Sequence, residues 1–182
     1  MAVLQELEVV AKVVLLVKMK MKILILFFMT LSWSTYGQKS IDQLMTDYNF
    51  KAPFISAKSL YKVQTTSVVL DAREKQEYQV SRIENALHIG YKNFDLNELR
   101  DLISDKNTTL IVYCSVGVRS GKIAEKLIAN GYTSVYNLYG GIFDWVNKGY
   151  PVYDDNKKTT EKVHVFSKKW GVYLSKGKKV YE

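Results

Sequence analysis

The chain has 182 residues, of which 47% are hydrophobic, so it can bury the core of one ordinary globular domain with extensions, whereas two large domains would not fit. A single cysteine excludes an internal disulfide and a cysteine-based structural zinc site, which leaves either a buried small side chain or a reactive thiol. Much of the formal net charge of +8 lies in a lysine-rich C-terminus, which is typical of a solvated face or of a surface that binds nucleic acid or another anionic surface.

The N-terminal region has the order of a secretory signal peptide. Lysines at positions 18, 20 and 22 precede an apolar run from Ile23 to Trp33, and small and polar residues follow that run. Because the run is well short of the roughly 20 apolar residues that cross a bilayer, we expect cleavage near Gln38 rather than a membrane anchor. Residues 1–20 are unusual for such a peptide, and Met19 or Met21 would be a more ordinary start.

The signal peptide sets the expected domain organisation and location. We assign 1–37 to the signal peptide, 38–53 to a helical extension, 54–153 to the main domain and 154–182 to a C-terminal extension. The protein is then periplasmic or secreted and keeps no stable membrane span after cleavage. Since an exported chain meets little nucleic acid, we interpret the basic C-terminus as a solvated face and expect no nucleic-acid partner.

Helical and strand-like patterns alternate along the main domain. Apolar runs predict buried strands within 67–74, 109–114 and 134–138. Amphipathic patterns with capping residues predict helices within 40–50, 55–64, 96–103, 120–131 and 140–149. Strands that alternate with helices predict an α/β domain with a central parallel sheet flanked by helices on both faces.

The segment 162–181 carries aromatic and β-branched residues and a Ser-Lys-Gly-Lys turn, which favours an added β-hairpin. Packing on the domain edge is one role for it. Docking of a partner and shaping of the entrance to a cleft are the alternatives, and the sequence does not decide among them.

The single cysteine, Cys114, is expected at the carboxyl end of the strand within 109–114. In parallel α/β sheets ligands bind beyond these strand ends. The following loop contains Gly117, which lets backbone amides turn inward, and ends with Arg119 at the start of a helix. Inward amides, a helix N-terminus and a guanidinium favour an anion, and such surroundings lower the pKa of a thiol. A core cysteine is the alternative. Nearby, we expect Asp71 to cap a strand end beside the site and Arg73 to pair with Glu77.

Three separated motifs resemble the rhodanese-like sulfurtransferases over residues 54–153. They are "VVLDAREKQEYQVSRIENALHIG", the loop "VYCSVGVRS" and "LYGGIFDWVNKGYPV". The resemblance implies a three-layer α/β domain in which Cys114 carries a sulfane sulfur as a persulfide. Ser81 and Arg82 stand where the family usually has Gly-His, and we interpret this as surface variation.

The predicted activity is sulfur transfer of the thiosulfate:cyanide type. Cys114 is the nucleophile, Arg119 and the backbone amides of the loop stabilise the anion, and Asp71 and Arg73 support the site. The residues expected to bind substrate are Ser115, Val116, Gly117, Val118, Arg119 and Ser120. The donor is thiosulfate or a similar small anion, and the acceptor is cyanide, a thiol or a protein. No metal or organic cofactor is expected.

Two other functions remain as alternatives. A rhodanese-like fold can serve as a non-catalytic binding or sensing module. Cys-dependent phosphatases and arsenate reductases are the weaker hypothesis, because the loop between Cys114 and Arg119 is one residue shorter than theirs and suits a sulfur atom better than a tetrahedral phosphate.

Overall fold

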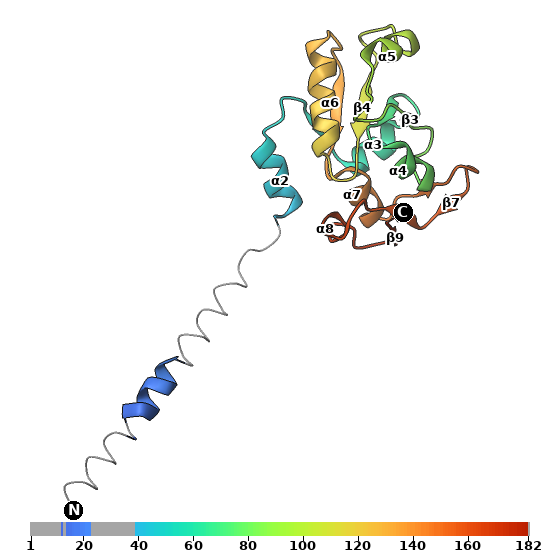
Figure 1. The fold of residues 1–182 in the computed structure, drawn as a ribbon. Coiled ribbons are helices and arrows are strands. Elements are labelled where there is room, and N and C mark those ends of the chain that lie inside the picture. Colours follow the sequence, from blue (N-terminus) through green and yellow to red (C-terminus); the bar gives the residue numbers. More distant parts are fainter. Residues whose placement is uncertain (1–11, 13, 23–38, 182) are drawn as a thin grey trace, which may run out of the picture. The chain divides into compact units, whose positions relative to one another are not determined.

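The computed structural model describes residue 12, residues 14–22 and residues 39–181 (Figure 1). Residues 14–22 are helical and belong to a unit separate from the body of the chain, which begins at Ser40. Most of the predicted signal peptide, including its apolar run, lies outside the described residues. Among the helices that are described, none is long and apolar enough to cross a membrane.

Five parallel strands form the central sheet, in the spatial order β1-β5-β4-β2-β3. Their bounds are β1 Phe54–Ile55, β2 Val68–Asp71, β3 Leu87–His88, β4 Leu110–Tyr113 and β5 Val135–Leu138. The central strand β4 is buried along its whole length, as its continuous apolar sequence predicts for a strand covered on both faces. The predicted parallel α/β architecture is therefore confirmed.

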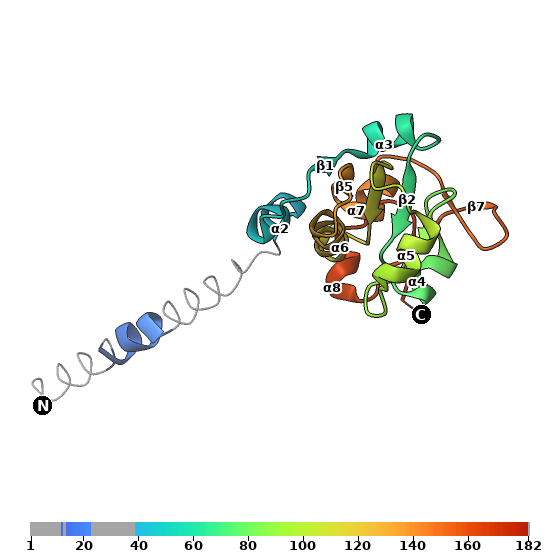
Figure 2. The ribbon, with the colours of Figure 1, turned by 90° about the horizontal axis from the view of Figure 1, so that it is seen from above.

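Helices cover both faces of the sheet and bury two separate clusters of apolar side chains (Figure 2). Ile111 and Tyr113 of β4 face one cluster, with α3 (Ala57–Val63) and α7 (Gly141–Asn147). Val112 faces the other, with α5 (Leu96–Leu102) and α6 (Val118–Ala129). This alternation follows from the two-residue period of a strand, so β4 anchors both layers.

Two further helices flank the sheet close to its carboxyl edge. The first, α2 (Ile41–Tyr48), begins with a capping box between Ser40 and Gln43 and lies within the segment expected to be helical. The second, α4 (Lys75–Val80), was not predicted, because six residues with few apolar positions give too weak a helical pattern.

The C-terminal extension differs in part from the predicted hairpin. An antiparallel hairpin is present, but it joins β6 (Val152–Tyr153) to β7 (Thr159–Thr160). Within 162–181 the strands β8 (Lys162–His164) and β9 (Lys178–Val180) pair in parallel, with the short helix α8 (Lys168–Gly171) between them. A parallel pair needs a crossover connection, and the Ser-Lys-Gly-Lys segment, which was expected to be the hairpin turn, only leads into β9.

The extension is nevertheless part of the main core. Val163, Val165 and Leu174 are at most 1% exposed and belong to the cluster that holds Trp145 and Ile142. It therefore packs on the domain, which was one of the roles left open by the sequence.

Candidate active site

Cys114 follows β4 directly at the carboxyl edge of the sheet. The strand itself ends at Tyr113, one residue earlier than predicted. Cys114 is 1% exposed, and its Sγ accepts a hydrogen bond from the backbone N–H of Gly117 at 3.2 Å. Gly117 has φ +104°, a conformation that L side chains rarely adopt, and it is the N-cap of α6. The loop thus folds back so that an N–H group faces the sulfur.

The start of α7 fixes the carbonyl side of this loop. The N–H of Ile142 donates to the carbonyl of Cys114 at 2.9 Å, and the N–H of Phe143 donates to that of Ser115 at 3.1 Å. A Cβ atom on Gly141 would lie 2.3 Å from the Cys114 carbonyl oxygen, so only glycine allows this approach. Since a trans peptide places N–H opposite C=O, the amides that follow these carbonyls turn away from α7.

A second set of contacts holds the loop from the side of β5. The Asn137 amide donates to the Gly117 carbonyl at 2.9 Å, and the Ser120 hydroxyl donates to the Asn137 side-chain oxygen at 2.7 Å. Ser120 was predicted to bind substrate. Its side chain is fully buried against Asn137 and does not line the cavity, because it lies on the face of α6 that packs on the sheet.

Helix α2 supports the same loop. A Cβ atom on Gly117 would lie 3.1 Å from the Met45 sulfur, and one on Gly121 would lie 2.7 Å from the Phe50 ring. Glycine at these two positions lets α2 and the residues after it pack directly on the start of α6. The helical extension is therefore in contact with the site, a role that its sequence did not suggest.

Arg119 is half of an ion pair. Its two terminal nitrogens donate to the Glu77 carboxylate at 2.6 and 2.7 Å, and Nη2 also donates to the Ser115 hydroxyl at 2.9 Å. Glu77, on α4, is 1% exposed. Burial alone would raise the pKa of Glu77, but the hydrogen bonds and charge of Arg119 outweigh burial and hold that pKa at about 2. The positive charge of the Arg119 guanidinium is therefore compensated by Glu77.

Asp71 and Arg73 form a second, fully buried pair. Arg73 Nη2 donates to Asp71 at 2.6 Å and also to the Ser81 carbonyl at 2.6 Å, while the Tyr113 hydroxyl donates to Asp71 at 2.6 Å. The predicted pairing of Arg73 with Glu77 is wrong, because Arg73 precedes α4 and turns back toward the end of β2. This network joins the ends of β2 and β4 and does not line the cavity.

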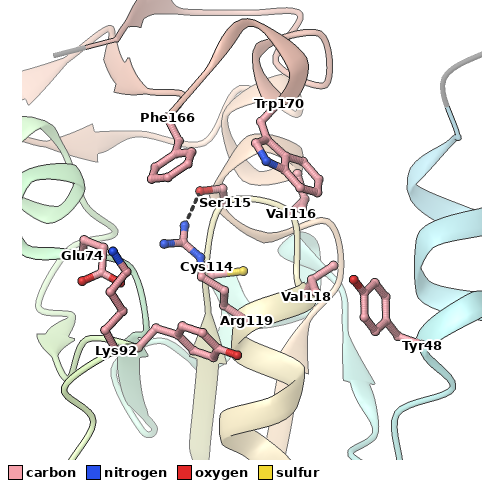
Figure 3. Close-up of a pocket in the computed structure, with 11 residues that line it drawn as sticks. Tyr48, Glu74, Lys92, Cys114, Ser115, Val116, Val118, Arg119, Phe166 and Trp170 are labelled. Atoms are coloured by element: carbon pink, nitrogen blue, oxygen red, sulfur yellow. Dashed lines mark hydrogen bonds between the residues drawn. The ribbon is translucent and has the colours of Figure 1, made fainter.

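A cavity of about 270 Å³ opens above Cys114 (Figure 3). Ser115, Val116, Val118 and Arg119, all predicted as site residues, line it together with Cys114. Gly117 contributes its N–H to the sulfur but does not line the cavity. The remaining lining residues were not predicted: Tyr48, Glu74, Tyr91, Lys92, Phe166 and Trp170.

The unpredicted lining residues come from segments far apart in the sequence. Figure 3 shows Phe166 and Trp170 of the C-terminal extension on one side of the cavity and Tyr48 of α2 on another. No local motif marks them, and only the tertiary packing of both extensions brings them to Cys114. Within 12, 14–22 and 39–181, no three or more His, Cys, Asp or Glu side chains form a group that could hold a metal ion.

Comparisons with known proteins relate the chain to a known family and to several named proteins. The sequence model of a family described as Rhodanese-like domain matches residues 56–148. A thiosulfate sulfurtransferase GlpE of Coxiella burnetii is 34% identical over 90 residues, which are 50% of this chain and 80% of the relative. A tRNA uridine(34) hydroxylase of Cytophaga hutchinsonii is 38% identical over 80 residues, but these are 43% of this chain and only 26% of that protein.

Solved structures agree on the fold. The Rhodanese-like domain of an Anabaena protein has a TM-score of 0.51 at 21% identity and covers 56% of this chain and 79% of its own. A thiosulfate sulfurtransferase of Pseudomonas aeruginosa has a TM-score of 0.52 at 23% identity and covers 63% of this chain and 22% of its own. With the family match over half of the sequence, these similarities and the loop geometry lead to one conclusion: the chain belongs to the family of rhodanese-like domains.

Proposed function

We propose that the protein is an exported sulfurtransferase that carries a sulfane sulfur on Cys114 as a persulfide. The observation that carries the proposal is the position of the Cys114 sulfur, which lies at the floor of an open cavity and accepts an N–H from its own loop. A cysteine with only a packing role needs neither the cavity nor the donor. The similarity to a thiosulfate sulfurtransferase over 80% of that relative's length supports the same reaction class.

The reaction has two steps. The Cys114 thiolate attacks the outer sulfur of thiosulfate, a bond forms between that sulfur and Sγ, the S–S bond of thiosulfate breaks, and sulfite leaves with the electron pair. An acceptor then attacks the outer sulfur of the persulfide and restores the thiolate. With cyanide the product is thiocyanate. Since the chain has a single cysteine, no internal thiol can resolve the persulfide, and the acceptor must come from outside.

Arg119 contributes less as a free cation than the sequence suggests. Its pair with Glu77 compensates the positive charge, and the Ser115 hydroxyl donates to the same carboxylate at 3.0 Å. We infer that this triad holds the wall of the cavity in place. Stabilisation of the leaving anion and of the persulfide then rests mainly on backbone N–H groups, of which that of Gly117 already faces the sulfur.

The test uses the full chain with thiosulfate and cyanide and follows thiocyanate formation, together with mass spectrometry of the protein after thiosulfate alone. We expect turnover and one added sulfur atom on Cys114. Cys114→Ser should abolish both signals. As a control for thiol chemistry alone, a cysteine introduced at the exposed Ser175 (Ser175→Cys) in the Cys114→Ser protein should restore neither.

Folded protein without either signal would contradict the proposal and favour a non-catalytic binding module. The hydroxylase activity in the name of some relatives is not carried over to this chain, because the matched region is only about a quarter of such a relative.

Export is a separate proposal that rests on the order of charged, apolar and small residues in 1–37. Cell fractionation with N-terminal sequencing should find protein outside the cytoplasm that begins near Gln38.

A further inference from the structure

We propose that the acceptor of the Cys114 sulfur is an organic thiol with an aromatic or aliphatic body, which the C-terminal extension selects through Phe166 and Trp170. The inference rests on the proposed function and specifies the substrate class of the same site. Small hydrated anions such as cyanide would then be poor substitutes for the acceptor.

The walls of the cavity are the first argument. Side chains of Tyr48, Val116, Val118, Phe166 and Trp170 surround the opening above Cys114. An apolar body gains free energy when it leaves water for such surroundings, whereas removal of the water shell of a small ion costs free energy. The volume of about 270 Å³ lies just below the roughly 300–1,000 Å³ typical of small-molecule sites, so there is room for a ring-sized group.

The charges around the cavity are the second argument. Arg119 is compensated by Glu77, and the other charged lining residues, Glu74 and Lys92, are of opposite sign. The cavity therefore carries no excess of positive charge that would attract a multiply charged acceptor. A body without net charge fits this balance best.

The conformation of Phe166 is the third argument. Its φ is +62°, which is costly for a bulky L residue, and the residue is 57% exposed, so packing does not offset the cost. Its N–H donates to His164 Nδ1 at 3.1 Å, which fixes the backbone at this point. Phe166 is thus an exposed aromatic residue with a strained backbone, and it lines the cavity above Cys114. These properties are those expected of a residue that contacts a ligand.

The extension also holds these two aromatic residues in fixed positions. Val163 and Val165 come shortly before Phe166, Leu174 follows Trp170, and all three are buried in the main core. Figure 3 shows Phe166 and Trp170 projecting from this anchored segment toward Ser115 and Cys114. The aromatic wall is thus built before any ligand arrives, which lowers the entropic cost of binding.

The chemical step is the second half of the proposed reaction. The acceptor thiolate attacks the outer sulfur of the Cys114 persulfide, a new S–S bond forms to the acceptor, and the bond between the outer sulfur and Sγ breaks. The electron pair returns to Sγ, which leaves the Cys114 thiolate and an organic persulfide. No oxidant or reductant is consumed.

The experiment separates loading from discharge. The full chain is loaded with thiosulfate, the donor is removed, and loss of the added sulfur from Cys114 is followed by mass spectrometry with benzyl mercaptan or 2-mercaptoethanol, two thiols of similar acidity. We expect benzyl mercaptan to discharge the persulfide at least about tenfold faster. In Phe166→Ala and in Trp170→Ala this ratio should fall several-fold. Val172→Ala, an exposed residue of the same extension outside the cavity, should keep it.

A variant that relieves backbone strain guards against misfolding as the cause. Asparagine tolerates φ near +60° better than phenylalanine does, so Phe166→Asn should melt no lower than the wild type and still lose the preference for the benzyl thiol. Equal discharge by both thiols in the wild type, or an unchanged ratio in the Phe166 variants, would overturn the inference.

Failure of the proposed function gives a different result. If thiosulfate adds no sulfur to Cys114, the cavity is tested on the thiol itself with iodoacetamide and N-benzyl iodoacetamide, which share one reactive group. Faster reaction of the benzyl reagent in the wild type, reduced in Phe166→Ala, would support recognition of an apolar body without sulfur transfer. Equal rates would overturn the inference as well.

Discussion

The loop after β4 and the segment 165–170 of the C-terminal extension face each other across the same cavity, and they are built in opposite ways. Residues of the loop are fixed through their backbone, by Ile142 and Phe143 on one side and by Asn137 on the other. Phe166 and Trp170 instead present side chains on a scaffold anchored by buried valines. Under the proposed function, the loop would hold the reacting sulfur and the extension would select the acceptor.

Removal of residues 154–182 is expected to have the largest effect, because it takes away the whole C-terminal extension. Three aliphatic side chains of the extension are fully buried in the main core, each worth about 1.5–3 kcal/mol, for a total of about 5–9 kcal/mol. Since whole domains are stable by only about 5–15 kcal/mol, the shortened chain should lose its cooperative unfolding transition in urea.

A matched pair of substitutions checks that burial is the reason. Val165→Ala, at a fully buried position, should cost about 2 kcal/mol in free energy of unfolding, whereas Val172→Ala, at a position 55% exposed, should cost less than about 0.5 kcal/mol. A shortened chain that unfolds at the wild-type urea concentration would show that the extension is not part of the core.

Gly141→Ala tests the backbone anchor of the loop. The new Cβ would meet the Cys114 carbonyl at 2.3 Å, and φ is +57°, so backbone strain and a clash with the loop should together cost about 3 kcal/mol and move the sulfur. Gly149→Ala is the control, because φ is +86° there and no atom lies within 4 Å of the new Cβ. It should lower stability by about 1 kcal/mol and leave thiocyanate formation unchanged; equal losses of activity would contradict the anchor.

Arg119→Met tests the ion pair in the wall of the cavity. It leaves the buried Glu77 carboxylate without its cation and should cost roughly 3 kcal/mol at pH 7. Arg82→Met, which breaks a pair with the 55% exposed Asp155, should cost less than about 1 kcal/mol.

The pH dependence gives a second readout for the same pair. Because the pKa of Glu77 is about 2 in the folded protein against an ordinary 4.5, the folded state is stabilised above pH 4.5 and loses this contribution, about 3 kcal/mol, as the pH falls toward 2. The difference between Arg119→Met and the wild type, measured by urea unfolding, should shrink over that range. A difference that stays constant from pH 7 to pH 2 would mean that the pair does not act through the charge of Glu77.

The parallel sheet and the loop around Cys114 were predictable because their signals are local. Continuous apolar runs gave β2, β4 and β5, and the spacing of Cys114, Gly117 and Arg119 indicated the loop. Strands β1 and β3 have two residues each, too few for a pattern.

The rest of the site depends on tertiary contacts. The spacing of Arg73 and Glu77 suits a helical pair, but α4 begins only at Lys75, and both side chains found other partners. Phe166 and Trp170 lie about 50 residues after Cys114 in a segment without a motif, and no rule of sequence spacing connects them to it.

The backbone anchoring of the loop has a consequence for how such proteins diverge. The carbonyls of Cys114 and Ser115 and the φ of Gly117 set the shape of the turn. The Ser115 hydroxyl is bonded to Glu77 and Arg119 and Val116 is buried in the core, whereas Val118 is only half-buried. A mutation at Val118, which lines the cavity, can therefore remodel the cavity wall while the turn keeps its geometry. At this position the shape of the cavity and the geometry of the turn can change independently.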